Sequence, residues 1–333
     1  MKDKVIKLSK INLNNNLNDK ANSNINLDRV DYICLETTNY CNLKCSFCNR
    51  EEVIDKLEHI SIESWAKLLD KIKDEPVKEA KFTGLGEPLL HPKFDVLCKM
   101  FKETFPNAFL IVATNCQYKI TSKFKNMMKH VDLLYLSIDG YKESYERDRA
   151  PAKWSKLMTF FDEFENIDRA NCRVTINYVV NPDNVLDIQK VHDKILLKYN
   201  LEELRLNIAQ DWSTNSNMLN SVGGYSEEKI RYLKENWKEN IKGKSQWEFN
   251  HCFWPKRALY TTVDGRVLMC ALNTDTESFG NIFTDSLDEI RSSKAYNDVR
   301  EGCSKNKPSD HCKNCSYKEL NPILDKLGIS SSH

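Results

Sequence analysis

The feature that most constrains the fold is an alternation of strand-length apolar runs with helix-length amphipathic runs across residues 31–209. The apolar runs are rich in β-branched and aromatic residues, while the segments between them repeat apolar residues at helical spacing. Strand–helix units in series predict a parallel sheet with its helices outside. The predicted strands are 31–38, 80–84, 108–114, 131–138, 172–180 and 203–209, and the predicted helices between them are 61–75, 92–104, 121–131, 153–167 and 185–199.

Three cysteines follow the first predicted strand. Cys41, Cys45 and Cys48 have C-x-x-x-C-x-x-C spacing, with the aromatic Phe47 before the last of them. Thiolates this close in sequence can bind three irons of a 4Fe–4S cluster and leave one iron without a protein ligand. Such an open iron is a place for chemistry as well as for electron storage. The alternative is a set of three buried or zinc-bound cysteines.

Composition narrows the function classes. Hydrophobic residues make up 41% and charged residues 29% of the 333-residue chain, which is typical of a globular protein. The net charge of +1 offers no field that would attract nucleic acid or an anionic membrane. No apolar run has the length of a membrane span, and the first residues do not form an export signal. Twelve cysteines in such a chain favour cluster ligation in a reducing cytoplasm over a disulfide framework.

The cysteine loop resembles that of the radical S-adenosylmethionine (SAM) enzymes. The resemblance implies that the amino and carboxylate groups of SAM chelate the open iron. It also implies that reduction cleaves SAM to a 5′-deoxyadenosyl radical, which abstracts hydrogen from substrate. The implied fold is a partial (β/α)6 barrel, TIM-like but open on one side. Active residues of such barrels lie at the carboxyl ends of the strands, where the loop of Cys41 begins.

The segment 83–88, TGLGEP, ends the second strand and is similar to the Gly-Gly-Glu-Pro signature of this family. The resemblance implies that Gly86 and Glu87 hold the methionine amino group of SAM. An ammonium needs acceptors, and glycine lets a ligand approach the backbone closely. The alternative is a simple turn at the end of the strand.

The third strand ends in Thr114, Asn115 and Cys116, where relatives often show Thr-Asn-Gly. The resemblance implies that Thr114 and Asn115 face the cavity, toward substrate or SAM. Cys116 departs from the pattern, and the simpler interpretation is a small residue that fills a glycine position.

The fourth strand ends at Ser137, which by resemblance binds the SAM carboxylate or ribose. Arg149 matches the position where relatives carry an arginine near the site, and a guanidinium can pair with a carboxylate through two hydrogen bonds. Arg147 is an alternative for that place, and a surface ion pair is the structural alternative for either arginine. Residues after strands five and six are predicted to line the barrel and select substrate: Asn177, Tyr178, Asn207, Gln210, Asp211 and Trp212.

A second set of cysteines lies in the last quarter of the chain. Cys252 and Cys270 are 18 residues apart, and a C-x-x-C pair, Cys312 and Cys315, follows. Four thiolates can close a 4Fe–4S site, and they also suit tetrahedral zinc. The layout resembles the twitch domain, the short form of the SPASM extension, in spacing similar to that of the aminocyclitol dehydrogenases. That resemblance implies one auxiliary, four-cysteine 4Fe–4S cluster.

The predicted organisation has two folded domains. A β-hairpin over 257–271, signalled by Asp264-Gly265, and a helix over 286–301 belong to the cysteine-rich end. The asparagine-rich start of the chain cannot bury enough apolar surface to order itself. The predicted boundaries are 1–30 for a flexible extension, 31–244 for the barrel, 245–320 for the auxiliary-cluster domain and 321–333 for a tail.

The resemblance covers about residues 31–320 and predicts reaction chemistry better than substrate. The favoured function is an oxidoreductase that oxidises a small-molecule alcohol or a sugar- or aminocyclitol-like substrate, with the auxiliary cluster accepting an electron. A flavodoxin- or ferredoxin-type protein would donate electrons. One alternative is an epimerase of a sugar-like substrate in which Cys303 or Cys116 donates hydrogen. The others are a peptide maturase, against which the missing peptide-recognition domain counts, and a non-enzymatic iron–sulfur or zinc scaffold.

Overall fold

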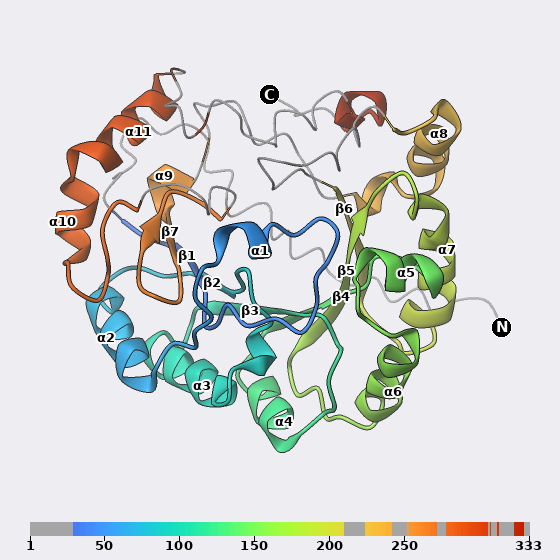
Figure 1. Cartoon of the computed structure of the whole chain (residues 1–333), viewed down its shortest axis with the longest axis horizontal. Helices are drawn as coiled ribbons and strands as arrows, with labels where there is room; N and C mark the ends of the chain where they lie inside the picture. The colour runs from blue at the N-terminus through green and yellow to red at the C-terminus, as the bar shows by residue number, and fades with distance from the viewer. Residues whose placement is uncertain are drawn as a thin grey trace.

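The structure, a computed structural model, describes residues 29–209, 224–241, 252, 254–271, 278–305, 307, 312 and 323–329. Its centre is one eight-stranded sheet in the order β6-β5-β4-β3-β2-β1-β7-β8, in which only the β7–β8 pair is antiparallel within this described part. The sheet curves into an open barrel (Figure 1). The predicted α/β fold is therefore confirmed. The strands are β1 (Tyr32–Leu35), β2 (Glu79–Phe82), β3 (Phe109–Thr114), β4 (Leu133–Ser137), β5 (Arg173–Val180), β6 (Glu203–Ile208), β7 (Ala258–Thr261) and β8 (Val267–Leu268).

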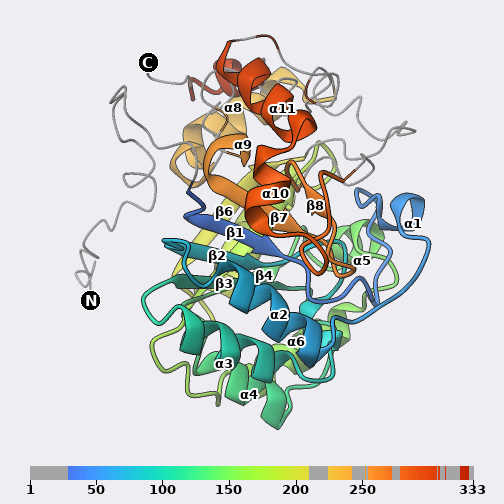
Figure 2. The same ribbon diagram turned by 90° about the vertical axis from the view of Figure 1, so that its left-hand side faces the viewer.

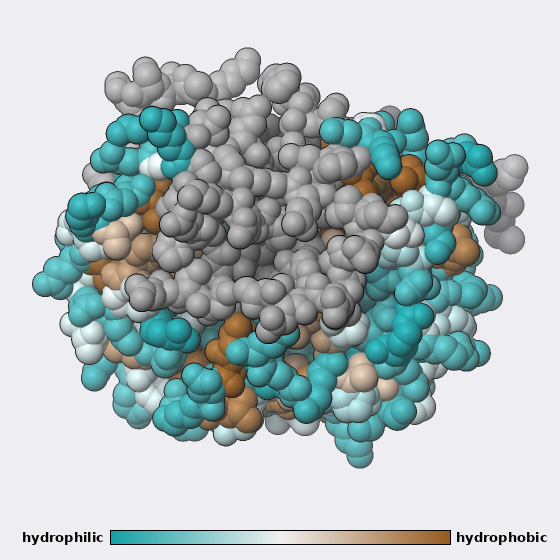
Figure 3. Space-filling model, turned by 45° about the horizontal axis from the view of Figure 1, so that its top comes forward, coloured by the Kyte–Doolittle hydropathy of each residue, from teal (hydrophilic) through white to brown (hydrophobic). Residues whose placement is uncertain are grey.

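Helices surround the outside of the sheet from β2 to β6, as Figures 1 and 2 show. The coloured part of the face in Figure 3 is mostly hydrophilic, with some apolar residues between the hydrophilic ones. No helix in the described part of the chain is both long enough and apolar enough to cross a bilayer. The helices are α1 (Arg50–Val53), α2 (Ile62–Ile72), α3 (Phe94–Thr104), α4 (Ser122–Met128), α5 (Glu143–Asp148), α6 (Trp154–Phe164), α7 (Ile188–Val191), α8 (Glu227–Asn236), α9 (Trp254–Arg257), α10 (Leu287–Ser292) and α11 (Lys294–Ser304), with single turns η1 (Pro88–Leu90), η2 (Val185–Asp187), η3 (His192–Leu196) and η5 (Lys238–Asn240).

The two faces of the sheet carry different cores because side chains alternate along each strand. Phe82 points outward, where the Trp65 ring of α2 meets it edge to face with 5.1 Å between ring centroids. Burying one such aromatic side chain contributes roughly 1.5–3 kcal/mol. Ile111, Leu133 and Tyr135 point the other way and form a separate cluster inside the barrel. The inner face thus carries a small cluster of its own, apart from the core under the helices.

Two predicted helices are wrong in detail. The segment 185–199 is a 3₁₀ turn, one α-helical turn and a π turn, in which Leu197 N donates to the carbonyl oxygen of His192. The segment 286–301 is two helices, α10 and α11. They separate because Ser293 adopts an extended ψ of 144° and its hydroxyl caps the start of α11. Apolar periodicity continues across both breaks and does not reveal them.

The C-terminal hairpin extends the barrel sheet itself. β7 pairs in parallel with β1, with Tyr260 opposite Cys34. It turns into β8 at the predicted Asp264-Gly265, where the φ of +86° at Gly265 favours glycine. Arg257 at the end of α9 binds the buried Asp31 carboxylate, with 2.9 Å between Nε and Oδ2. The cysteine-rich end is thus joined to the first barrel strand by main-chain hydrogen bonds.

Candidate active site

The loop 41–48 follows β1 at the edge of the sheet where the parallel strands end, and α1 comes next in front of the barrel (Figure 1). Backbone bonds hold this loop against the end of α5, which follows β4, and against the loop after β2. Ser46 N donates to Asp148 O over 2.9 Å, and Glu87 N donates to Tyr40 O over 2.7 Å. The ends of β1, β2 and β4 therefore share one site.

The thiols of this loop form no disulfide. Cys41, Cys45 and Cys48 lie close enough that a charge on one disfavours a charge on the others. Burial raises the pKa of Cys45 to about 12, so a bound cation such as cluster iron is what would make it a thiolate near neutral pH. Two donors point at the sulfurs: Asn115 Nδ2 lies 3.9 Å from Cys41 Sγ, and Arg149 Nη1 lies 3.9 Å from Cys45 Sγ. Such donors hold and tune ligating thiolates.

A 4Fe–4S cluster and a single metal ion need different arrangements of their ligands. Among the described residues, no three His, Cys, Asp or Glu side chains converge closely enough to hold one metal ion. A 4Fe–4S cluster does not require such convergence, because each thiolate binds a different iron. The loop thiols therefore suit the cluster that the sequence predicts.

Glu87 is buried at the end of β2. Its Oε1 accepts from Thr114 Oγ1 over 2.8 Å, and its Oε2 accepts from Asn115 N over 2.7 Å. Burial raises its pKa to about 7, although these hydrogen bonds lower it. The structure thus brings three of the predicted residues together and orients a carboxyl group that can change charge near neutral pH.

The two glycines of the 83–88 loop allow close backbone approach. A Cβ on Gly86 would lie 2.1 Å from the Thr38 carbonyl oxygen. A Cβ on Gly84 would lie 2.4 Å from Glu36 Oε1. Any side chain at either position would push the loop away from the segment that leads into the cysteines.

Glu36 is a site residue that the sequence analysis missed. It is buried, its Oε1 accepts from Leu85 N over 2.7 Å, and its Oε2 accepts from Val263 N over 3.1 Å. Burial raises its pKa to about 7. It thus joins the predicted SAM loop to the C-terminal hairpin. The available signal was an acidic residue inside the apolar run 31–38.

Cys116 has a φ of +61°, a conformation that glycine adopts without strain. This agrees with the interpretation that it fills a glycine position. Its side chain has no exposed surface. Beside it, Asn115 Nδ2 donates to Asn42 Oδ1 over 2.7 Å, which ties the third strand to the cysteine loop.

Arg149 lies beside the loop and Arg147 does not. Arg149 is buried, and its Nε donates to Asp139 Oδ2 over 2.5 Å. Burial is the largest single effect and lowers its pKa, but the Asp139 charge and hydrogen bond, together with Cys45 and Tyr145, raise it above the ordinary value. Its guanidinium carbon also lies 5.5 Å from the centroid of the Phe47 ring. Arg147, whose side chain is half exposed, instead pairs with the buried Asp148, with 2.6 Å between Nε and Oδ1.

Ser137 and two asparagines line neighbouring strands on the inner face. Ser137 lies opposite Asn177 in the β4–β5 register, and Asn207 Nδ2 donates to Asn177 Oδ1 over 2.9 Å. All three keep some exposed surface. Tyr178 was predicted to line the barrel, but it points outward, is buried, and donates to Asn184 O over 2.7 Å. The other predicted lining residues, 210–212, lie outside the described residues.

The second cysteine set is also gathered. Cys252 and Cys270 are buried in one cluster with Cys34 of β1. Cys303 of α11 is hydrogen-bonded to Cys312, which together with burial raises the pKa of Cys303 well above its ordinary value, and Cys252 is near enough to add to the shift. Cys315 lies outside the described residues.

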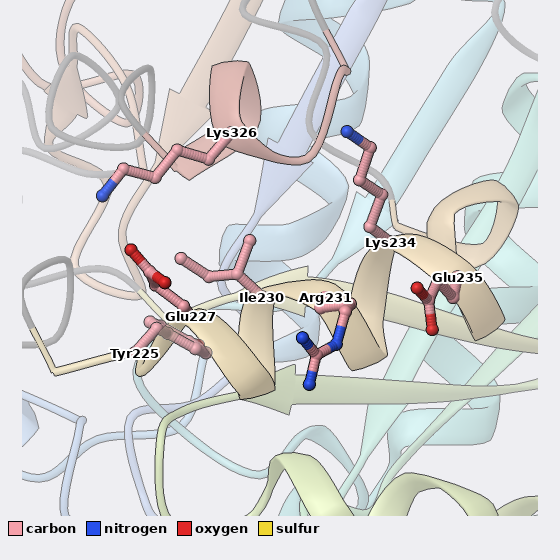
Figure 4. Close-up of a pocket in the computed structure, with 7 residues that line it drawn as sticks. All are labelled: Tyr225, Glu227, Ile230, Arg231, Lys234, Glu235 and Lys326. Atoms are coloured by element: carbon pink, nitrogen blue, oxygen red, sulfur yellow. The ribbon is translucent and has the colours of Figure 1, made fainter.

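An open groove of about 760 Å³ lies elsewhere, beside α8 (Figure 4). Lys326 reaches over α8 from the end of the chain, opposite Glu227. The groove contains none of the predicted site residues, which gather at the strand ends instead. Its lining is Tyr225, Glu227, Ile230, Arg231, Lys234, Glu235 and Lys326.

Comparisons with known proteins agree with this geometry. Residues 35–195 match the radical SAM superfamily, and residues 252–316 match the SPASM family, an iron–sulfur cluster-binding domain. A GTP 3′,8-cyclase of Chlorobaculum tepidum is 33% identical over 86 residues, which are 26% of this chain and 26% of the cyclase. The antilisterial bacteriocin subtilosin biosynthesis protein AlbA of Bacillus subtilis is 24% identical over 307 residues, 86% of this chain and 67% of AlbA.

Solved structures share the fold. BtrN in complex with AdoMet and 2-DOIA superposes with a TM-score of 0.54 at 17% identity, over 86% of this chain and 92% of BtrN. Streptococcus suis SuiB bound to its precursor peptide SuiA gives a TM-score of 0.65 at 16% identity, over 82% of this chain and 67% of SuiB. The two matched domains imply 4Fe–4S clusters and SAM as cofactors. The chain belongs to the radical SAM superfamily: it is a radical SAM enzyme that carries a C-terminal SPASM domain.

Proposed function

We propose that this enzyme is a dehydrogenase that oxidises a small-molecule alcohol of the sugar or aminocyclitol kind. When bound, SAM and the clusters supply a 5′-deoxyadenosyl radical to remove a carbon-bound hydrogen and an acceptor for the electron left behind. A flavodoxin- or ferredoxin-type donor would reduce the first cluster. The chain's own residues hold these groups and orient the substrate.

The observation that carries the proposal is the place of the second cysteine set. Cys252 and Cys270 pack with Cys34, Tyr260 and Trp254 on the inner face of β1 and β7. Cys34 alternates with residues that face the helices, so this cluster borders the barrel interior. Thiols placed there suit an electron acceptor that lies beside the substrate, which oxidation needs and epimerisation does not.

The residue roles follow from position. Cys41, Cys45 and Cys48 would bind the first cluster, and Cys252, Cys270, Cys312 and Cys315 the auxiliary one. Gly86, Glu87, Asn115, Ser137, Arg149 and Phe47 surround the first cluster loop or the strand ends beside it and would hold SAM. Asn177 and Asn207 would contact substrate. Thr114, predicted to face the cavity, is buried and donates to Glu87, so it would act by holding that carboxyl group. In support, the chain spans 92% of BtrN, whose complex holds 2-DOIA.

Product mass tests the proposal. Anaerobic, reconstituted enzyme is incubated with SAM, a reductant and a panel of cyclitols, aminocyclitols and sugars. We expect a product two mass units lighter than its substrate. A Cys312→Ala, Cys315→Ala enzyme should still form 5′-deoxyadenosine but release no oxidised product, because the second electron has no acceptor. Solvent deuterium gained at carbon without that mass loss would overturn dehydrogenation and favour epimerisation with Cys303 or Cys116 as donor.

Peptide modification is the second candidate. It is favoured by the match to AlbA, a bacteriocin biosynthesis protein, over 86% of this chain, and by the fold shared with SuiB, which was solved with a precursor peptide. A peptide product from a precursor encoded beside this gene, with no turnover of any cyclitol or sugar, would replace the small-molecule proposal.

A further inference from the structure

Two cations lie inside the barrel on strands that face each other. Lys81 of β2 alternates with Ala80 and Phe82, which pack in the helix-side core, so Lys81 points inward. Arg205 of β6 alternates with core leucines in the same way. Neither residue belongs to the SAM site described above.

Tyr135 of β4 lies between these cations. Lys81 Nζ is 5.9 Å and Arg205 Cζ is 5.6 Å from the centroid of the Tyr135 ring. Arg205 Nη1 also donates to the Tyr135 hydroxyl oxygen over 3.2 Å. The hydroxyl keeps its own proton to donate to a ligand. The three side chains thus bring one ammonium, one guanidinium and one hydroxyl into one part of the barrel interior.

In the described part of the chain, neither cation has a carboxylate within ion-pair distance. Within the described residues, the Lys81 ammonium makes no hydrogen bond or ion pair, and the Arg205 guanidinium bonds only the neutral Tyr135. Burial lowers the pKa of Lys81, while both Lys81 and Arg205 retain some accessible surface. Glu79, the next inward-facing residue of β2, attracts both Lys81 and Arg205 electrostatically but forms no ion pair within 4 Å of either. Glu203 and Arg173 also influence Tyr135, and neither forms an ion pair within 4 Å of Lys81 or Arg205 in this part of the chain. One carboxylate acting from beyond ion-pair distance on two cations leaves a net positive charge in this part of the barrel, and an anionic ligand would offset the cost of burying it.

This cation pair adjoins the residues proposed to bind substrate. Arg205 lies opposite Asn177 in the β5–β6 register, and Asn177 lies opposite Ser137 in the β4–β5 register. Asn207 is the next inward-facing residue along β6. Ser137, Asn177 and Arg205 therefore form a row across three neighbouring strands on the inner face. A substrate held at Asn177 would extend along this row toward the cations.

We propose that Lys81, Arg205 and Tyr135 bind an anionic group of the substrate, a carboxylate or a phosphate, at the end away from the reacting carbon. The proposal rests on the proposed oxidation of a small molecule and narrows it to an acidic one. A guanidinium, a hydroxyl and an ammonium match the acceptor-rich oxygens of such a group.

Binding of simple anions tests the site without turnover. Full-length, cluster-reconstituted enzyme is titrated anaerobically by calorimetry with inorganic phosphate and with succinate, at constant ionic strength in chloride. We expect saturable binding of at least one of them; preference for phosphate or for succinate identifies a phosphate or a carboxylate on the substrate. Lys81→Met and Arg205→Met should each weaken binding by about tenfold, the loss of one charge-assisted hydrogen bond.

A surface control and two milder variants separate loss of the anion site from loss of folding. Lys99→Met on the outside of α3, where Lys99 pairs with Glu103 at 3.6 Å, should bind as the wild type does. If the Arg205→Met enzyme fails to fold, Arg205→Lys and Tyr135→Phe replace it and should weaken binding several-fold. No saturable binding, or equal affinity in the wild type and in all interior variants, overturns the site. SAM cleavage without substrate should be unchanged in Lys81→Met. Anion binding without any alcohol oxidation would therefore retain this site and reject the dehydrogenase alone.

Discussion

Glu87 shows how a single residue acquires a property that its type does not predict. Its carboxyl group accepts from Thr114 and Asn115 while burial raises its pKa to about 7. The group therefore changes from mostly neutral to mostly charged between about pH 6 and pH 8. A charged acceptor binds an ammonium more strongly than a neutral one does.

The first prediction concerns SAM binding by Glu87→Gln. At pH 8 the variant should bind SAM about tenfold more weakly than the wild type, and at pH 6 the difference should nearly vanish. Equilibrium binding of SAM to the anaerobic, oxidised enzymes at both values measures this. Protonation of SAM itself affects both proteins equally. The ratio of their affinities for SAM therefore reports the charge of Glu87. A ratio that stays constant with pH would place the ammonium elsewhere.

At the scale of elements, the loop after β2 must fit against the segment that follows β1. Gly86 permits this, because any Cβ there would meet the Thr38 carbonyl at 2.1 Å. The loop after β3 has the opposite feature, since Cys116 occupies a left-handed conformation with φ of +61°. One loop therefore requires a glycine, and the other would accept one.

The second prediction compares Gly86→Ala with Cys116→Gly. Gly86→Ala should displace the cysteine loop, destabilise the protein by about 3 kcal/mol and reduce iron at the first cluster. Cys116→Gly should preserve iron content and change the free energy of unfolding by less than about 1 kcal/mol, because relief of strain offsets added chain entropy. Iron analysis and anaerobic denaturant unfolding check both. Normal iron binding in Gly86→Ala would contradict the close approach.

At the scale of the whole molecule, Glu36 links the barrel to the C-terminal hairpin through Leu85 and Val263. Its pKa is raised from the ordinary 4.5 to about 7. Between about pH 4.5 and pH 7, Glu36 is therefore protonated more often in the folded protein than in the unfolded chain. The contribution of Glu36 to stability is full below about pH 4.5 and is lost as pH rises toward 7.

The third prediction follows from that sign. The free energy of unfolding of the wild type minus that of Glu36→Gln should fall by about 2.5 kcal/mol from pH 5 to pH 8. Denaturant unfolding under anaerobic conditions measures it, and other carboxylates cancel in the difference. Glu103→Gln, an exposed change on α3, should show no such trend. A difference independent of pH would refute the raised pKa.

The fourth prediction is the metal content of the two-domain enzyme. Anaerobic reconstitution should load about eight irons per chain, in two 4Fe–4S clusters. Replacing Cys41, Cys45 and Cys48 together by alanine should leave about four, with the visible spectrum of a four-thiolate cluster. Four irons in the wild type together with zinc at the C-terminal end would refute the auxiliary cluster.

Local patterns in the sequence predicted much of the fold and of the first cluster loop. Strands and tight turns are specified by residues that are close together in the sequence. The six parallel strands and the Asp264-Gly265 hairpin therefore agree with expectation. The spacing of Cys41, Cys45 and Cys48 is likewise a local property. The split of 286–301 at Ser293 escaped prediction because one side-chain cap decided it.

The sequence by itself determined the radical SAM chemistry, since closely spaced thiols and strand-end motifs carry their chemistry wherever the chain folds. Only the tertiary structure decided which groups share an environment. It selected Arg149 over Arg147, turned Tyr178 outward, placed Glu36 against Val263, 227 residues away, and set Lys81 opposite Arg205. Contacts between residues so far apart in the sequence form only when the sheet curves around its interior. Burial in that interior then shifts the pKa, and with it the charge, of the side chains it encloses.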